Sequence, residues 1–246
     1  MTLTHAPAAP TTAAVVTAAA APATAAVVCG ATSEPHLTRI LLDPRTRNGR
    51  ADLQDAASLH RLTMRLAPET LGSTPRQEAG VLFRLDDTPA GPVLLVQTAG
   101  APRLDRLAER GHQTASRPLG PLLDRLLPGL RVAYRIAANP TRRDGNSRPE
   151  TKGKLQALTG QDALEWWARR AADAGLGSVL VDTTSPAPAL TGISSNGQRF
   201  KHAVTVYTGT AVVTDPDALR TAISIGVGRG KAHGAGLLTI AALDTN

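Results

Sequence analysis

The sequence is poor in cysteine, aromatic residues and lysine, and each shortage limits what the protein does. Its single cysteine, Cys29, excludes an internal disulfide bond and favours a reducing compartment, the cytoplasm. The six histidines are scattered without metal-ligand spacing, so we expect neither a metal site nor a cofactor. With two Phe, two Tyr and two Trp, a surface that binds single-stranded nucleic acid mainly by base stacking is excluded.

The charge balance is strongly basic. The 27 Lys and Arg residues exceed the 20 Asp and Glu residues, for a net charge of +7. This is the electrostatic pattern of a protein that binds a polyanion such as RNA. Only four basic residues are lysines, so the arginine bias is also explained by genomic base composition. The spacing of motifs must decide between these explanations.

Residues 1–36 are rich in Ala, Thr and Pro, with no Lys or Arg before Arg39. Such a composition supplies too few large apolar groups to fold alone, and we expect a disordered tail. The stretch lacks the basic start of a secretory signal, and Pro22 interrupts any membrane span, so no membrane association is expected. The remaining chain is divided into two domains, residues 37–128 and 129–246.

Hydrophobic periodicity predicts the order strand, helix, strand, strand, helix in the first half. The predicted ranges are 36–43, a helix from Asp52 to Pro68, 81–85, 93–98 and 102–110. Asp52 is expected to cap the first helix. A fourth strand is not distinct between residues 117 and 127, where prolines interrupt the pattern.

The same order begins again at Gly129. The predicted elements are a strand at 130–137, a helix at 161–174, strands at 179–182 and 200–214, a helix opened by Asp215 and Pro216, and a strand at 237–242. Two successive βαββαβ halves predict an α+β fold of two tandem ferredoxin-like domains.

The most specific motif is the segment Gly226-Val-Gly-Arg-Gly-Lys-Ala-His-Gly-Ala-Gly236. Glycines at this spacing permit positive φ angles and a close approach of the backbone to another chain. The segment supplies a first set of expected RNA contacts: Gly228, Arg229, Lys231, His233 and Gly234. A nucleotide-binding P-loop is excluded, because Ile225 stands where such a loop needs Gly and Ala232 where it needs Ser or Thr.

Three further stretches accompany this motif. They are Leu-Thr-Arg-Ile-Leu-Leu-Asp-Pro at 37–44, Tyr-Arg-Ile-Ala-Ala-Asn-Pro-Thr-Arg-Arg at 134–143 and Val-Val-Thr-Asp-Pro-Asp-Ala-Leu-Arg at 212–220. Together they resemble the CasE branch of the repeat-associated RNA-processing proteins of CRISPR systems, over nearly all of residues 37–242. The resemblance implies an endoribonuclease that cuts the repeat hairpins of CRISPR precursor RNA at the base of the stem. It also implies that the protein keeps the cut RNA and joins other subunits in the Cascade complex.

Cleavage of this kind has defined chemical requirements. RNA carries its own nucleophile, so the enzyme must remove the ribose 2′-proton, protonate the departing 5′-oxygen and stabilise charge on the phosphate. No metal is required, and the product carries a 2′,3′-cyclic phosphate. Histidine suits proton transfer because its ordinary pKa is about 6.5. His60 stands where the resembling proteins carry their catalytic histidine, and the resemblance implies the same role.

The chain departs from the family beside this histidine. Many relatives carry a tyrosine one turn earlier, where this chain has Ala57. Ser58 and Arg61 are assigned supporting roles, but the second acid or base stays unassigned. An alternative therefore stays open, a subunit that holds the RNA hairpin without cutting it. A second alternative is a metabolite-binding protein of the same fold, which phosphorylated ligands would stabilise.

Basic residues of the second half supply the remaining expected RNA contacts. They are Arg135, Arg142, Arg143, Arg199 and Lys201, with Arg148 in the same loop as Arg143. Phe200 and His202 offer rings for stacking. Phosphate contacts give a salt-dependent affinity, whereas sequence choice must come from accessible bases.

Overall fold

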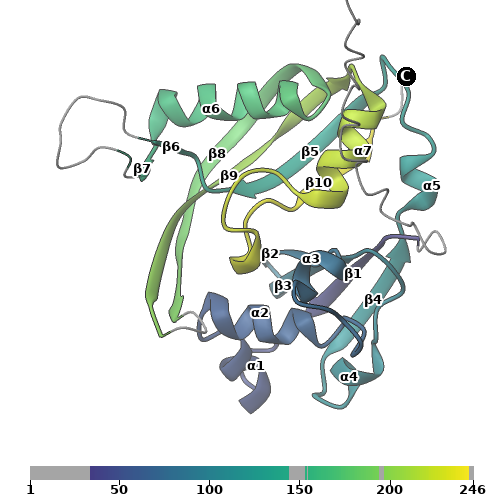
Figure 1. Cartoon of the computed structure of the whole chain (residues 1–246), viewed down its shortest axis with the longest axis vertical. Helices are drawn as coiled ribbons and strands as arrows, with labels where there is room; N and C mark the ends of the chain where they lie inside the picture. The colour runs from purple at the N-terminus through teal and green to yellow at the C-terminus, as the bar shows by residue number, and fades with distance from the viewer. Residues whose placement is uncertain (1–33, 144–152, 154, 194–196, 244–246) are drawn as a thin grey trace, which may run out of the picture. The chain divides into compact units, whose positions relative to one another are not determined.

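The computed structural model of the chain describes residues 34–143, 153, 155–193 and 197–243 (Figure 1). The expected tail, apart from residues 34–36, lies outside these ranges, and so does Arg148. No helix among the described residues is long and apolar enough to cross a membrane.

The first half contains four strands and five short helices in the described residues. They are β1 (His36–Leu41), α1 (Arg47–Asp52), α2 (Ala56–Met64), α3 (Pro75–Glu78), β2 (Leu82–Thr88), β3 (Gly91–Thr98), α4 (Asp105–Ala108), β4 (Gln113–Pro118) and α5 (Gly120–Leu123). The second half contains β5 (Arg131–Ala138), β6 (Thr141–Arg143), β7 (Leu155–Ala157), α6 (Gly160–Asp173), β8 (Leu176–Ile193), β9 (Arg199–Val213), α7 (Pro216–Ile225), the 3₁₀ helix η1 (Lys231–His233) and β10 (Leu238–Ala242).

The two four-stranded sheets have the same topology. The first has the order β2-β3-β1-β4, and the second, read in the same sense, has the order β8-β9-β5-β10. All of these pairings are antiparallel. Each sheet therefore runs second, third, first, fourth strand of its half, which is the ferredoxin-like arrangement. The predicted fold class is confirmed, while the domain boundary at residues 128 and 129 stays a prediction.

The start of the first long helix differs from the prediction. Asp55, not Asp52, is the N-cap of α2, and its side chain accepts a hydrogen bond from the Ser58 backbone N–H at 2.6 Å. Asp52 instead ends α1, where its buried carboxylate contacts Arg110 and His112, each at 2.8 Å. Leu53 lies at helical spacing from Ala56, so the prediction began the helix three residues too early and did not include α1.

Two strands also differ from the prediction. The fourth strand, β4, ends at Pro118 and thus precedes most of the region searched for it. β8 is much longer than residues 179–182 and continues through Pro186, which pairs with Thr205 of β9. Proline is tolerated here because β8 is an edge strand, and a register irregularity follows between Ala187 and Leu190.

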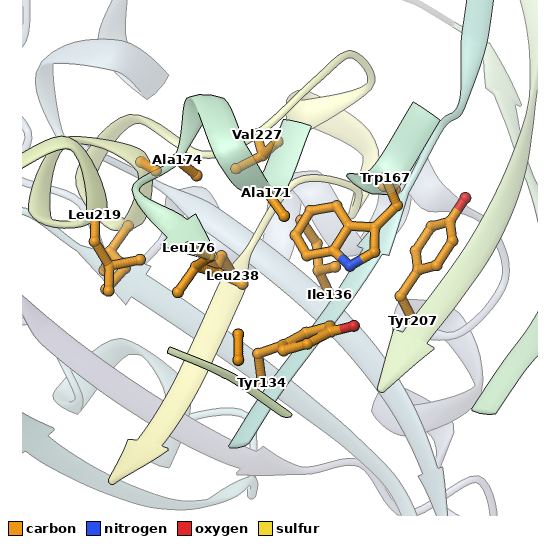
Figure 2. Packing of buried hydrophobic residues seen from close by; sticks show 14 of the residues in the cluster. Tyr134, Ile136, Trp167, Ala171, Ala174, Leu176, Tyr207, Leu219, Val227 and Leu238 are labelled. Atoms are coloured by element: carbon orange, nitrogen blue, oxygen red, sulfur yellow. The ribbon is translucent and has the colours of Figure 1, made fainter. Parts of the chain in front are cut away.

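Each half has its own hydrophobic core. In the second half Trp167 of α6 packs between Tyr134 and Tyr207, with ring centroids 5.4 and 5.6 Å away (Figure 2). The two tyrosine hydroxyls donate to the carbonyl oxygens of Leu180 and Ala163, so their burial leaves neither group unpaired.

A buried arginine joins the two halves. Arg84 of β2 is 2% exposed, and its guanidinium donates to the backbone oxygens of Arg135 in β5 and Leu237, next to β10, at 2.9 and 3.2 Å. It also pairs with Asp86 at 3.0 Å, and the same carboxylate accepts a hydrogen bond from the Arg135 side chain. Guanidinium and carboxylate are thus both satisfied at the contact between the sheets.

A buried amide makes a second connection. The Gln97 side-chain amide of β3 donates to the carbonyl oxygen of Ile223 in α7 at 2.8 Å. Leu37 of β1 packs against the core of the second half. The first sheet therefore contacts the second half through its two central strands as well as through β2.

Replacing Arg84 with methionine is expected to lower the free energy of unfolding by about 2–4 kcal/mol, because backbone carbonyls and Asp86 lose a buried charged donor. Urea unfolding followed by circular dichroism measures the change. Arg103→Met is the control, since Arg103 is 35% exposed and pairs only at the surface with Glu69 and Asp105. Equal stability of the Arg84→Met variant and the unmodified chain would contradict this role.

Candidate active site

Helix α2 carries His60 at the boundary between the two halves. The buried face of α2, with Leu59, Leu62 and Thr63, packs into the core of the first half and fixes the helix. His60 lies beside that face and is half-buried. In Figure 1 the β8–β9 hairpin reaches past its own sheet to α2, so elements of both halves surround this helix.

The glycine-rich loop packs closely on the first half. Gly234 has a φ of +96°, and a Cβ there would lie 3.0 Å from the Phe83 ring of β2. A Cβ at Gly226 would lie 2.8 Å from Leu82, again with positive φ. Gly228 faces Trp166 of the second half in the same way, at 3.2 Å. These glycines are required by packing and backbone conformation.

Four rings meet where this loop approaches α2. His233 of η1 stacks on Phe200 of β9 at a centroid distance of 3.8 Å, and His202 stacks beside both at 5.5 and 5.4 Å. His60 meets His233 edge-on at 6.5 Å. We call these four residues, His60, Phe200, His202 and His233, the ring cluster. It joins residues from distant parts of the sequence and from both halves of the fold.

One nitrogen of each facing histidine is enclosed. Nδ1 of His60 and Nδ1 of His233 are buried, and neither has a hydrogen-bond partner among the described residues. The Nε2 atoms do not belong to this buried, unpaired set and make no hydrogen bond within the described residues. In each ring Nδ1 is thus the enclosed nitrogen, whereas Nε2 is not enclosed in this way.

Two cations lie next to the ring cluster. Arg76 of α3 and Lys231 of η1 both line a pocket of about 240 Å³. Arg76 is held by a hydrogen bond to the Val81 carbonyl oxygen at 3.0 Å. Sequence analysis assigned Lys231 but missed Arg76, because a single arginine between Pro75 and Gln77 belongs to no local pattern.

The environment lowers the pKa of every histidine in the cluster. Burial is the main cause for His60, and the charges of Arg76 and Arg61 add to it. Burial and the nearby His202 and His60 lower the pKa of His233 to about 4. Burial and Arg229 lower the pKa of His202. Burial and Arg76 also lower the pKa of Lys231.

The two residues assigned to support His60 contact each other. The Arg61 guanidinium donates to the Ser58 hydroxyl at 2.8 Å. Ser58 is buried and Arg61 is exposed. Ala57, one turn before His60, lies 3.3 Å from where a Cβ on Gly192 of β8 would stand, and the Phe200 ring closes the same space. Helix α2 thus presents no second titratable ring.

The other predicted RNA contacts fall into two groups. Arg135 is engaged with Asp86 and Thr208, and Arg143 donates to the Gly153 carbonyl oxygen at 3.0 Å. Besides Arg143, the exposed side chains are Arg142, Arg199, Lys201 and Arg229. Arg199 and Lys201 line an open hollow of about 470 Å³ together with Phe200 of the ring cluster. The hollow therefore adjoins the histidines.

No group of three or more His, Cys, Asp or Glu side chains in the described part of the chain is arranged to hold a metal ion. The ring cluster itself contributes three histidines, but they stack face to face or edge to face. They do not converge on one point, as a coordination site requires.

Two ferredoxin-like halves with a glycine-rich loop before the last strand define the class of protein. The chain belongs to the CRISPR-associated protein family, whose model matches residues 36–242. This confirms the family resemblance inferred from the motifs.

Individual relatives match over nearly their whole length. The chain is 29% identical over 218 residues to the CRISPR-associated endoribonuclease Cse3 of Thermus thermophilus, covering 83% of this chain and 99% of the relative. The structure of Thermus thermophilus Cse3 bound to an RNA representing a pre-cleavage complex matches with a TM-score of 0.67 and 28% identity, over 85% and 99% of the two chains. A chain of a CRISPR RNA-guided surveillance complex, pre-nicking, matches at 38% identity with a TM-score of 0.61, over 85% and 100%.

Replacing Arg76 with methionine is expected to raise the pKa of both His60 and Lys231, because a cation that disfavours their protonated forms is removed. Titration of the histidine ring resonances by NMR measures the change at His60. Arg65→Met, which removes an exposed charge from the residue following α2, is the control. An unchanged His60 titration in the Arg76→Met variant would contradict the electrostatic contact.

Proposed function

We propose that this protein is a metal-independent endoribonuclease that cleaves CRISPR precursor RNA at the base of its repeat hairpins. The observation that carries the proposal is the pair of facing histidines, His60 and His233, with one open nitrogen each beside the cations Arg76 and Lys231. The names of the relatives support the same reaction class, since one is a CRISPR-associated endoribonuclease.

The geometry supplies what cleavage by an internal nucleophile needs. The ribose 2′-oxygen attacks phosphorus, the bond from phosphorus to the 5′-oxygen breaks, and a proton moves at each end. His60 transfers one of these protons through Nε2. Arg76 and Lys231 stabilise the charge on the phosphate oxygens. No water is consumed in this step, and the products are a 2′,3′-cyclic phosphate and a 5′-hydroxyl.

Recognition of the hairpin is assigned to the exposed cations of the second half. Arg142, Arg199, Lys201 and Arg229 project from β6, β9 and the glycine loop, and each adds a phosphate contact. Five of the six aromatic residues are buried in the two cores, and only Phe200 remains at the site. Shape and phosphate recognition of a stem therefore outweigh base stacking.

Retention of the product follows from the same contacts. All four cations lie outside the ring cluster, and their contacts do not depend on an intact scissile bond. We propose that the protein acts in the cytoplasm and keeps the cut guide RNA as a subunit of a Cascade complex. The solved chain from an RNA-guided surveillance complex, 38% identical, supports this assignment.

Cleavage of a repeat-hairpin RNA by the unmodified chain is expected to continue in EDTA. It is expected to stop when the 2′-hydroxyl before the scissile phosphate is replaced by hydrogen. His60→Ala should lower the single-turnover rate constant by about 10²–10⁴-fold, because one proton transfer is lost. Gel analysis gives the rate, and mass spectrometry of the 5′ fragment identifies the cyclic phosphate.

The outcome also tests the non-cleaving alternative raised by Ala57. Tight binding of the hairpin with no cleavage by the unmodified chain would identify an RNA-holding subunit and contradict the catalytic proposal. Loss of activity in EDTA that Mg²⁺ restores would contradict metal independence.

Replacing Lys201 with methionine is expected to weaken hairpin binding uniformly across stem sequences. The slope of log affinity against log salt concentration should fall by about 1, because one phosphate contact is lost. Fluorescence anisotropy at several salt concentrations measures the slope. Arg106→Met is the control, since Arg106 lies in the first half and pairs with Glu69. An unchanged slope in Lys201→Met would remove Lys201 from the binding surface.

A further inference from the structure

The cleavage reaction requires two proton carriers, and helix α2 supplies only one. Position 57, one turn before His60, is alanine. The Ser58 hydroxyl accepts a hydrogen bond from Arg61, and the Thr63 hydroxyl donates to the carbonyl oxygen of His60. The second carrier must therefore come from another element of the fold.

His233 lies where such a carrier is needed. Its ring centroid is 6.5 Å from that of His60, and the two planes meet at 63°. Two general acid–base groups acting on one phosphate must each reach an oxygen on opposite sides of phosphorus, at about 2.6–3.2 Å. Rings at this separation lie close enough for both to reach oxygens of one phosphate group. His60 makes no ring contact with His202, so His233 is the histidine that faces it.

The loop holds the His233 ring in a defined position. Gly230 and Gly234, both left-handed, begin and end η1, and the His233 backbone N–H donates to the Gly230 carbonyl oxygen at 2.9 Å. Phe200 stacks on the ring at 3.8 Å. With Nδ1 enclosed, Nε2 is left as the atom available for proton exchange. The orientation of the His233 ring is thus set before substrate binds.

The groups around His233 favour its neutral form. His60 of α2, His202 of β9, and the cations Lys231 and Arg76 surround it, and no carboxylate forms a pair with it in the described residues. Its pKa of about 4 leaves the ring neutral at pH 7, in the form that accepts a proton. The pKa of His60 is lowered as well, but less far, so of the two rings His60 more readily carries a proton.

We propose that His233 is the second catalytic residue, the base that takes the 2′-hydroxyl proton while His60 protonates the departing 5′-oxygen. This assignment rests on the proposed endoribonuclease function and deepens it. One bond from phosphorus to O2′ forms and one from phosphorus to O5′ breaks. One proton moves to Nε2 of His233 and one leaves Nε2 of His60, so the step balances without any other reactant.

The test compares His233→Phe with the unmodified chain in single-turnover cleavage of the repeat hairpin. Phenylalanine keeps the ring that stacks on Phe200 but has no nitrogen. The rate constant is expected to fall by about 10²–10⁴-fold, while hairpin affinity changes less than threefold. His36→Phe, at the start of β1, is the matched control and should cleave normally. His202→Phe should lose less than tenfold.

A modified substrate separates the two roles. When sulfur replaces the bridging 5′-oxygen at the scissile phosphate, the leaving group no longer needs protonation. This substrate should restore cleavage by His60→Ala, which lacks the acid. It should not restore cleavage by His233→Phe, which lacks the base. A merely structural role of His233 would not produce this difference.

Any of three results would overturn the assignment while leaving the proposed function intact. The first is cleavage by His233→Phe within threefold of the unmodified rate. The second is a loss in His202→Phe as large as that in His233→Phe. The third is restoration of cleavage by His233→Phe with the sulfur substrate. Absence of cleavage by the unmodified chain would instead overturn the proposed function and this assignment together.

Discussion

The architecture depends on one buried guanidinium at the contact between the two sheets. Arg84 donates to the carbonyl oxygens of Arg135 and Leu237, and Asp86 balances its charge. A cation 2% exposed is tolerated only where every donor has a geometrically fixed acceptor. Those acceptors belong to the central strand and the entry to the last strand of the second half. The pairing of the halves is therefore specified by directional bonds as well as by apolar packing.

This constraint matters because the ring cluster is divided between the halves. His60 comes from the first half, whereas His233 and Phe200 come from the second. Leu82 and Phe83, which immediately precede Arg84, are the residues against which Gly226 and Gly234 pack. The strand that carries the buried arginine thus also positions the loop that carries His233. A shift between the halves would change the separation of the two histidines, and proton transfer tolerates little displacement.

The sequence was sufficient for the fold class and for the family, but less so for individual elements and their boundaries. Periodicity located β1, β5, β9 and the start of α7 within one or two residues, because each is a single uninterrupted pattern. It misassigned the cap of α2, since Leu53, which follows α1, lies at helical spacing from Ala56 in α2. It shortened β8, since Pro186 is read as an interruption whereas an edge strand accommodates it.

The candidate site shows a different kind of limit. His60 and His233 were each found in the sequence, one by family resemblance and one by its motif, but with separate roles. The two residues lie far apart in the sequence, so no local sequence pattern indicates that they come into contact. Arg76 escaped notice for the same reason, since its relation to His60 and Lys231 exists only after folding. From the sequence, Ala57 indicates the loss of the tyrosine that many relatives carry at this position. In the structure, Ala57 and the Phe200 ring both border the space beside Gly192 of β8. Phe200 in turn stacks on His233, the ring that meets His60 edge-on.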